Sequence, residues 1–137
     1  MGNSNKKITT CFMFNGKAEE AMNFYTSVFD QSEINSVFHH EDGTVLHATF
    51  TLKGQTFMVM DNSNKQEHPF TPAISLFVTC DIEEEINRVF KQLSQDGKIL
   101  MPLAAYPFSE KFGWVEDKYG VSWQLNLISP LMNLDTR

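Results

Sequence analysis

The stretch of sequence that decides the fold is GWVEDKYGVSWQLNL, residues 113–127, because it has a counterpart 66 residues earlier, HATFTLKGQTFMVMD at residues 47–61. Each stretch is predicted to form two strands joined by a turn, whose glycine, Gly54 or Gly120, directly precedes the last strand. In residues 121–127 apolar and polar side chains alternate, which is the period of a strand with one buried face. The chain therefore contains two similar halves.

The segments in front of these stretches follow the same order in both halves. A short apolar run precedes a segment with apolar residues at helical spacing, and extended segments come next. In the first half Asp42-Gly43 is a strong hairpin signal. In the second half Asp81 is the predicted helix N-cap, with Glu84 as its capping-box partner. We predict strands at residues 8–14, 33–40, 45–52, 55–61, 73–80, 98–103, 112–116 and 121–127, helices starting at Ala18 and Asp81, and a loop at residues 104–111.

This repeated order indicates one α+β domain, residues 1–137, made of two tandem βαβββ modules. The first module spans about residues 8–61, a polar, proline-containing linker follows at residues 62–72, and the second module spans about residues 73–127. Half of this length rarely buries enough surface for a stable core of its own. Internal duplication within one domain therefore explains the pattern better than two separate domains.

Charge and composition exclude several classes of protein. The formal net charge is −6 and no cluster of Lys and Arg stands out, so phosphate backbones are repelled and nucleic acid is not an expected partner. No window approaches the 18 or so apolar residues of a membrane-spanning helix, and we predict a cytoplasmic protein with no membrane partner. Cys11 and Cys80 lie far apart in apolar runs, which is typical of buried free thiols rather than of a disulfide or a zinc site.

The alternation of the strands predicts which side chains lie away from the helices. In the last strand Trp123 and Leu125 are predicted to lie beneath the helix, with Gln124 on the other face. If the two sheets curl toward each other, the faces without a helix line a concave cleft of the kind that binds small molecules. A second core or a dimer contact are the alternatives. The residues assigned to this cleft are Thr10, Phe12, Phe14, Met58, Ser75, Phe77, Tyr106, Trp114 and Gln124.

Three stretches together resemble a known family. They are FNGKAEEAMNFY at residues 14–25, FTPAISL at residues 70–76 and GWVEDKYGVSWQL at residues 113–125. The chain resembles, over about residues 7–127, the PhnB-like branch of the glyoxalase, bleomycin resistance and dioxygenase superfamily, also called the vicinal oxygen chelate superfamily. The resemblance implies U-shaped mixed sheets, ligand sites in concave clefts and a homodimer.

The same resemblance implies where a metal would bind. Metal-using members carry ligands, usually His or Glu, at positions that correspond to Thr10, Met58, Ser75 and Gln124. Neutral hydroxyl, thioether and amide groups are poor ligands for divalent ions. We therefore predict no metal and no cofactor.

The histidines are the possible substitutes. If the Asp42-Gly43 turn sets the register, His40 opposes Val45 and lies diagonal to His47 on one face. His68, in the linker, can overhang the cleft. Surface positions are the simpler interpretation for all three.

Two functions and a third, structural role remain open. The first is a metal-free protein that binds a small molecule, similar to the resistance proteins of the superfamily. The second is an enzyme of lyase, isomerase or dioxygenase type that uses Tyr106, Trp114 and Gln124, with residues 104–111 as a lid. The third is a structural dimer module. Relatives are often labelled 3-demethylubiquinone-9 3-methyltransferases, yet the glycines here are isolated turn residues and no glycine-rich cofactor loop is present in the sequence.

Overall fold

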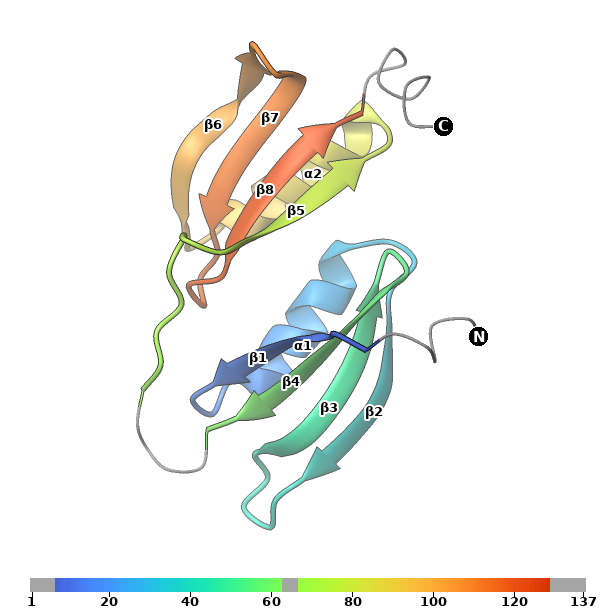
Figure 1. Ribbon diagram of the computed structural model, residues 1–137, viewed down its shortest axis with the longest axis vertical. Coiled ribbons are helices and arrows are strands. Elements are labelled where there is room, and N and C mark those ends of the chain that lie inside the picture. Colours follow the sequence, from blue (N-terminus) through green and yellow to red (C-terminus); the bar gives the residue numbers. More distant parts are fainter. Residues whose placement is uncertain (1–6, 63–66, 129–137) are drawn as a thin grey trace. The chain divides into compact units, whose positions relative to one another are not determined.

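The computed structural model of the protein describes residues 7–62 and 67–128, and it divides between His68 and Pro69 into two compact units. Each unit is a βαβββ module (Figure 1), so the predicted α+β class is confirmed. Residues 63–66 of the predicted linker lie outside the described residues. The elements are β1 (Thr10–Phe14), α1 (Ala18–Val28), β2 (Glu33–His39), β3 (Val45–Leu52), β4 (Gln55–Asp61), β5 (Ser75–Cys80), α2 (Glu83–Ser94), β6 (Lys98–Tyr106), β7 (Ser109–Glu116) and β8 (Ser122–Leu127).

The two sheets have the same topology. The strand order is β1-β4-β3-β2 in the first unit and β5-β8-β7-β6 in the second. In each unit the first strand pairs in parallel with the last one, and the remaining pairs are antiparallel, so both sheets are mixed. One helix covers one face of each sheet (Figure 1). We call the other face of each sheet its open face.

Aromatic rings fill the core between α1 and its sheet. The ring of Phe12 lies 6.3 Å from Tyr25 of α1 and 5.8 Å from Phe57 of β4, measured between ring centroids. Phe50 of β3 stacks 5.6 Å from Phe57. Tyr25 and Phe50 are fully buried. The first unit therefore has an apolar core of its own, as its tight ring packing shows.

The core of the second unit is built from α2, β7 and β8. Trp123 of β8 is 1% exposed, and Ile86 and Leu93 of α2 are fully buried. The periodic apolar face of α2 and the alternation of β8 thus meet as the sequence predicts. No helix in the described ranges is long and apolar enough to cross a membrane.

Each unit also buries one carboxylate. Asp61, at the end of β4, accepts hydrogen bonds from the backbone N–H groups of Gly16 and Ala18 at 2.8 and 3.0 Å, and from Val45 at 2.8 Å. It therefore joins the start of α1 to the start of β3. A buried carboxylate with several N–H donors is satisfied without a cation.

The second carboxylate, Asp117, lies in the turn between β7 and β8. It accepts hydrogen bonds from the backbone N–H groups of Tyr119 and Val121 at 2.8 and 3.0 Å, and from the indole Nε1–H of Trp123 at 2.9 Å. These three donors lie within six residues along the chain, so the bonds fix a local turn.

The predicted start of α2 is wrong. The helix begins at Glu83 after Ile82, which has extended backbone and provides no side-chain cap. The residue that reaches back is Glu85, whose Oε1 accepts from the backbone N–H of Asp81 at 2.9 Å. Helical spacing with Ile86 and Val89 predicts that Ile82 is buried, yet Ile82 is 59% exposed because it precedes the helix.

Two further predictions fail in the strands. Residues 104–111 form no loop, because β6 runs to Tyr106 and β7 starts at Ser109, which leaves a tight turn at Pro107 and Phe108. In β3 the register shifts opposite Phe38 and His39, so that Val45 is buried while Leu46 is 50% exposed. Alternation in residues 45–52 predicts that Leu46 shares the face of Ala48 and Phe50, and the bulge breaks this alternation.

Candidate functional site

Three of the residues assigned to a cleft form one row across the open face of the second sheet. Phe77 of β5 pairs with Gln124 of β8, and Gln124 pairs with Trp114 of β7. Residues that pair across neighbouring strands point to the same face. The side chains of Phe77, Gln124 and Trp114 therefore lie next to one another, away from α2.

A hydroxyl pair lies beside this row. Ser75 pairs with Ser122, and their Oγ atoms are 2.6 Å apart. The indole Nε1–H of Trp114 donates to Ser122 Oγ at 2.8 Å. These bonds fix the position of the Trp114 ring, and one of the two serine hydroxyls keeps an O–H that can donate to another group.

An aromatic cluster continues the surface toward β6. The Phe112 ring lies 6.4 Å from Phe77, 5.9 Å from Tyr106 and 4.9 Å from Phe108, between centroids. The Tyr106 hydroxyl donates to the carbonyl oxygen of Pro102 at 2.7 Å. Tyr106 therefore contributes a ring to this surface, while its proton is held by the backbone.

The sequence reasoning missed Phe108 and Phe112. Phe112 lies two residues from Trp114 on the same strand, so alternation alone places both on one face. Phe108 was hidden by the assumption of a loop at residues 104–111.

Two amide side chains on this face have no protein partner. Within residues 7–62 and 67–128, the side chains of Gln124 and Asn126 make no hydrogen bond. Asn126 pairs with Phe112 and is 7% exposed, whereas Gln124 is half-buried. Solvent reaches both amides, and polar groups on a largely apolar surface are suited to orient a bound molecule.

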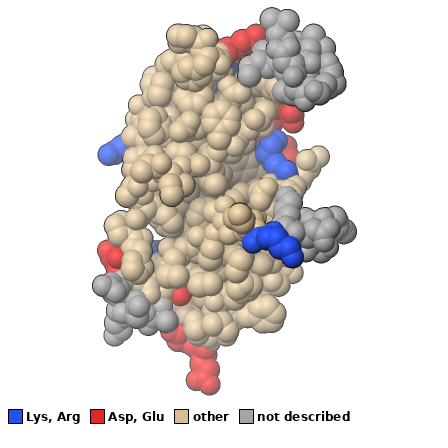
Figure 2. Space-filling view, in the orientation of Figure 1, with Lys and Arg blue, Asp and Glu red and all other residues tan. Residues whose placement is uncertain are grey.

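Charged side chains on the open faces stand at the ends of the strands, as Glu33 does in β2 and Glu116 in β7. In the orientation of Figure 1 the strands lie in front of the helices, and in the same view most of each unit's surface is uncharged, with Lys, Arg, Asp and Glu near the margins (Figure 2). In the second unit the row of Phe77, Gln124 and Trp114 contains no ionisable group. Ionisable residues of this face lie beside the row, where Glu116 pairs with Ser122 and Lys98 pairs with Glu116.

In the first unit only Met58 of the assigned residues lies on the open face. The prediction that Thr10, Phe12 and Phe14 face away from the helix is wrong, because Phe12 contacts the ring of Tyr25 in α1 and Thr10 pairs with Phe57 of the core side. Cys11 and Met13 occupy the open face in their place, and Cys11 is exposed rather than buried. The offset of 66 residues, applied to Phe77, identifies Cys11 directly.

The four positions implied for a metal do not fit a divalent ion. Thr10 and Met58 lie on opposite faces of their sheet, since Met58 pairs with Cys11 and Thr10 with Phe57. The Ser75 hydroxyl already pairs with Ser122. Neutral donors that are divided in this way cannot replace the hydration shell of such an ion.

His40 and His47 do not form the pair that was considered as an alternative to surface positions. His39, not His40, opposes Val45, and His47 opposes Phe38. The Nε2 atom of His39 lies 2.8 Å from Glu19 Oε1 on α1. His68 is exposed at the boundary of the two units. Among the residues that the structure describes, no three His, Cys, Asp or Glu side chains gather as a metal site.

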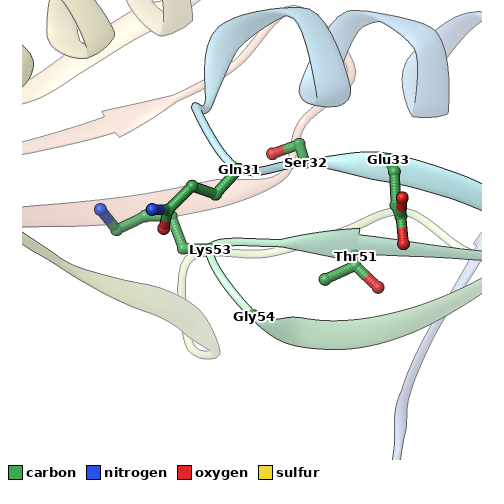
Figure 3. A pocket seen from close by; sticks show the side chains of 6 residues that line it. All are labelled: Gln31, Ser32, Glu33, Thr51, Lys53 and Gly54. Atoms are coloured by element: carbon green, nitrogen blue, oxygen red, sulfur yellow. The ribbon is translucent and has the colours of Figure 1, made fainter. Parts of the chain in front are cut away.

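A pocket of about 380 Å³ lies elsewhere in the first unit, where the β3–β4 turn meets the segment between α1 and β2 (Figure 3). It contains no residue that the sequence assigned to a site. Gln31 and Lys53, which line it, have positive φ angles of 55° and 49°, and this follows from their turn positions. The lining residues are Gln31, Ser32, Glu33, Thr51, Lys53 and Gly54.

The two βαβββ units define the class of protein, a glyoxalase-like α+β fold. A glyoxylase/bleomycin resistance protein/dioxygenase domain from Frankia sp. EAN1pec has a TM-score of 0.68 with 13% identity, over 93% of this chain and 95% of that one. This likeness concerns the fold alone. A family model described as 3-demethylubiquinone-9 3-methyltransferase matches residues 6–126, and the chain belongs to this family.

Two relatives agree with that membership. A PhnB protein from Bacillus cereus is 63% identical and has a TM-score of 0.87, over 90% of this chain and all of that one (100%). Protein YjdN of Escherichia coli K12 is 29% identical over 87 residues, which are 64% of this chain and 58% of YjdN. The predicted membership of the PhnB-like branch is thus confirmed.

Proposed function

We propose that this protein binds a small, uncharged organic molecule on the open face of its second sheet, without a divalent metal. The observation that carries the proposal is the row of Phe77, Gln124 and Trp114, in which an unpaired amide lies between two aromatic side chains. Rings supply apolar contact area, and one or two amides fix the orientation of a ligand.

The chemistry of the row favours a neutral, flat ligand with hydrogen-bonding groups. A carbonyl or hydroxyl group can pair with the amides of Gln124 and Asn126, while an apolar portion packs on Trp114 and Phe112. A charged ligand would lose its hydration with no opposite charge in the row, which is costly.

Binding is a better interpretation than catalysis for this surface. Acid–base catalysis needs a group that can gain or lose a proton beside the reacting atoms. The Tyr106 hydroxyl and the Trp114 indole are both engaged in hydrogen bonds to the protein. The amide of Gln124 does not titrate. The carboxylate of Glu116 belongs to the next pair on this face, opposite Ser122, and thus lies at the end of the row and not within it. The lid invoked for an enzyme at residues 104–111 consists mainly of paired strand.

Methyl transfer, which the family description mentions, has no support in the local structure of the first helix. A cofactor carboxylate or phosphate would bind at free N–H groups of a helix N-terminus. At α1 the N–H groups of Gly16 and Ala18 already donate to Asp61. The Asp61 carboxylate would also repel a second anion at this position.

A thermal-shift screen of neutral metabolites and aromatic compounds on the full chain tests the proposal. A ligand at a hundredfold excess over its Kd raises the apparent stability by about 2.7 kcal/mol. We expect Gln124→Ala to weaken binding of such a ligand by about 1 kcal/mol or more, the cost of one buried hydrogen bond. Gln95→Ala, at an exposed amide after α2, serves as the matched control. Equal loss in both variants, or none in either, would exclude the proposed site.

We also propose that the protein is a homodimer, as the resemblance implies. Within each unit the strands β1 and β2, or β5 and β6, have only one neighbour in their own sheet. Such edges are often covered by association. Sedimentation at micromolar concentration should give twice the mass of 15.7 kDa, and a monomer would contradict this proposal.

A further inference from the structure

Sulfur-containing side chains gather on the open face of the first sheet. Cys11 of β1 pairs with Met58 of β4, and Met13 of β1 pairs with Met60 of β4. The second pair lies two residues further along both strands than the first, so both pairs point to the same face. The four side chains therefore form two adjacent rows. Neighbouring strands lie about 4.8 Å apart, and residues i and i+2 lie about 6.7 Å apart along a strand, both within the span of flexible Met side chains.

An imidazole lies at the end of one row. Ala48 of β3 pairs with Val59, so the preceding residue, His47, and the following one, Met60, stand side by side where the paired stretch ends. The pairing of His47 with Phe38 places its ring on the same open face. Within the described ranges the His47 side chain makes no hydrogen bond, so both ring nitrogens are available.

These side chains are also accessible. Cys11 is exposed and Met13 is 36% exposed, while His47, Met58 and Met60 are half-buried. None of them packs into the aromatic core beneath α1. Leu or Val would make an equally apolar surface. The thioether sulfur of Met differs from them because it has lone pairs that can bind a metal ion.

We propose that the open face of the first sheet binds one Cu(I) ion through the thioethers of Met13, Met58 and Met60 and the imidazole of His47. Cu(I) is soft and prefers thioether, thiolate and imidazole ligands, whereas Zn²⁺ and Mg²⁺ are better served by anionic donors that this group lacks. A neutral ligand set also suits a monovalent ion, because it adds no excess negative charge to an uncharged surface.

Cys11 flanks this group opposite Met58. Desolvation raises the pKa of its thiol. Cys11 lies in the row of Met58, away from His47, whereas Met13 and His47 both flank Met60. The proposed ligands are therefore the three thioethers and His47.

This site departs from the expectation of no metal. That expectation weighed four positions singly, and among them only Met58 carries sulfur. Strand alternation already places Met58 and Met60 on one face, and the register adds Met13, because it reverses the face expected for Phe12 and Phe14. The site lies in the first unit and is independent of the proposed ligand surface in the second.

Anaerobic titration of the full chain with Cu(I), in competition with a chromophoric Cu(I) chelator, measures stoichiometry and affinity. We expect one equivalent to bind. In protein labelled with ¹³C at the methionine methyl groups, the signals of Met13, Met58 and Met60 should shift, while those of the core residue Met22 and of Met101 in β6 should not.

Variants separate this site from non-specific binding. Met60→Leu and Met58→Leu conserve side-chain volume and should each weaken Cu(I) binding at least tenfold, with unchanged circular dichroism. His47→Gln should weaken binding to a similar extent. Met101→Leu is the matched control and should change nothing. Unchanged affinity in both Met58→Leu and Met60→Leu would overturn the proposal, and so would a loss of binding in Cys11→Ser alone, because a single thiol would then account for it.

Discussion

The two units share one topology but use their buried carboxylates differently. In the first unit Asp61 bonds to backbone N–H groups that lie 45, 43 and 16 residues away along the chain. In the second unit Asp117 accepts from groups two, four and six residues away. Both halves share an apolar pattern, and this pattern sets the order of their helices and strands. The hydrogen bonds of the buried carboxylates differ between the two units.

The two helices start differently as a consequence. The start of α1 depends on Asp61, a residue from the far end of its unit. The start of α2 depends on Glu85, a residue of the helix itself, which bonds to the backbone of Asp81. We expect α1 to form only when its sheet is complete, whereas α2 carries part of its own cap.

The largest loss of stability is expected when an aromatic core residue is truncated, and its size should differ between the two units. Trp123→Ala should cost about 3–5 kcal/mol of unfolding free energy, since it removes a fully packed ring. Phe57→Ala, at the equivalent position of the first unit, should cost somewhat less, because it leaves no buried carboxylate without its donor. Denaturant unfolding of both variants measures this. A smaller loss in Trp123→Ala than in Phe57→Ala would contradict the role given to the Asp117 contact.

A change of about 2 kcal/mol is expected for either carboxylate, in the range for hydrogen bonds to a charged group. Asp61→Asn should speed hydrogen exchange at the amides of Gly16, Ala18 and Val45. Asp117→Asn should speed exchange only near residues 119–123. Hydrogen exchange measured by NMR tests this difference. Faster exchange of the same amides in both variants would contradict it.

An effect of about 1 kcal/mol is expected at the start of α2. Glu85→Ala removes the acceptor for the N–H of Asp81 and should fray the first turn. Glu84→Ala, which the capping-box pattern would have selected, removes only an exposed contact with Arg88 and should change stability by less than about 0.5 kcal/mol. Thermal unfolding of the pair decides between the two residues.

The smallest effect is expected on the open face of the second unit. Gln124→Ala should change the free energy of unfolding by less than about 0.5 kcal/mol, because its amide has no partner within the described ranges. A loss comparable to that of Trp123→Ala would mean that Gln124 is structural. The assignment of the strand faces in β8 would then need revision.

The second unit was predicted better than the first for a physical reason. In β8 apolar and polar residues alternate, so Trp123 and Gln124 are assigned to their faces by composition alone. In β1 both faces carry apolar or sulfur-containing residues, and the sequence TCFMF has no alternation to use. Its face is set by pairing with β4, which local sequence does not reveal.

The remaining errors come from shifts of one residue. A bulge near Leu46 moves His39 into the position expected for His40, and the helix starts one residue later than a cap at Asp81 requires. Spacing rules tolerate such shifts poorly, because a single residue reverses the face of a strand. The aromatic cluster around Phe112 was hidden for a related reason, since the length of β6 was underestimated.

The parallel pairing of β1 with β4, and of β5 with β8, has a consequence for synthesis on the ribosome. Neither sheet can be completed until the last strand of its unit has emerged, because the first strand has no other neighbour in the sheet. The first unit is complete, with β4 already occupied by β1, before β8 is translated. Synthesis in this order keeps the duplicated strands from exchanging partners while the second half of the chain is being made.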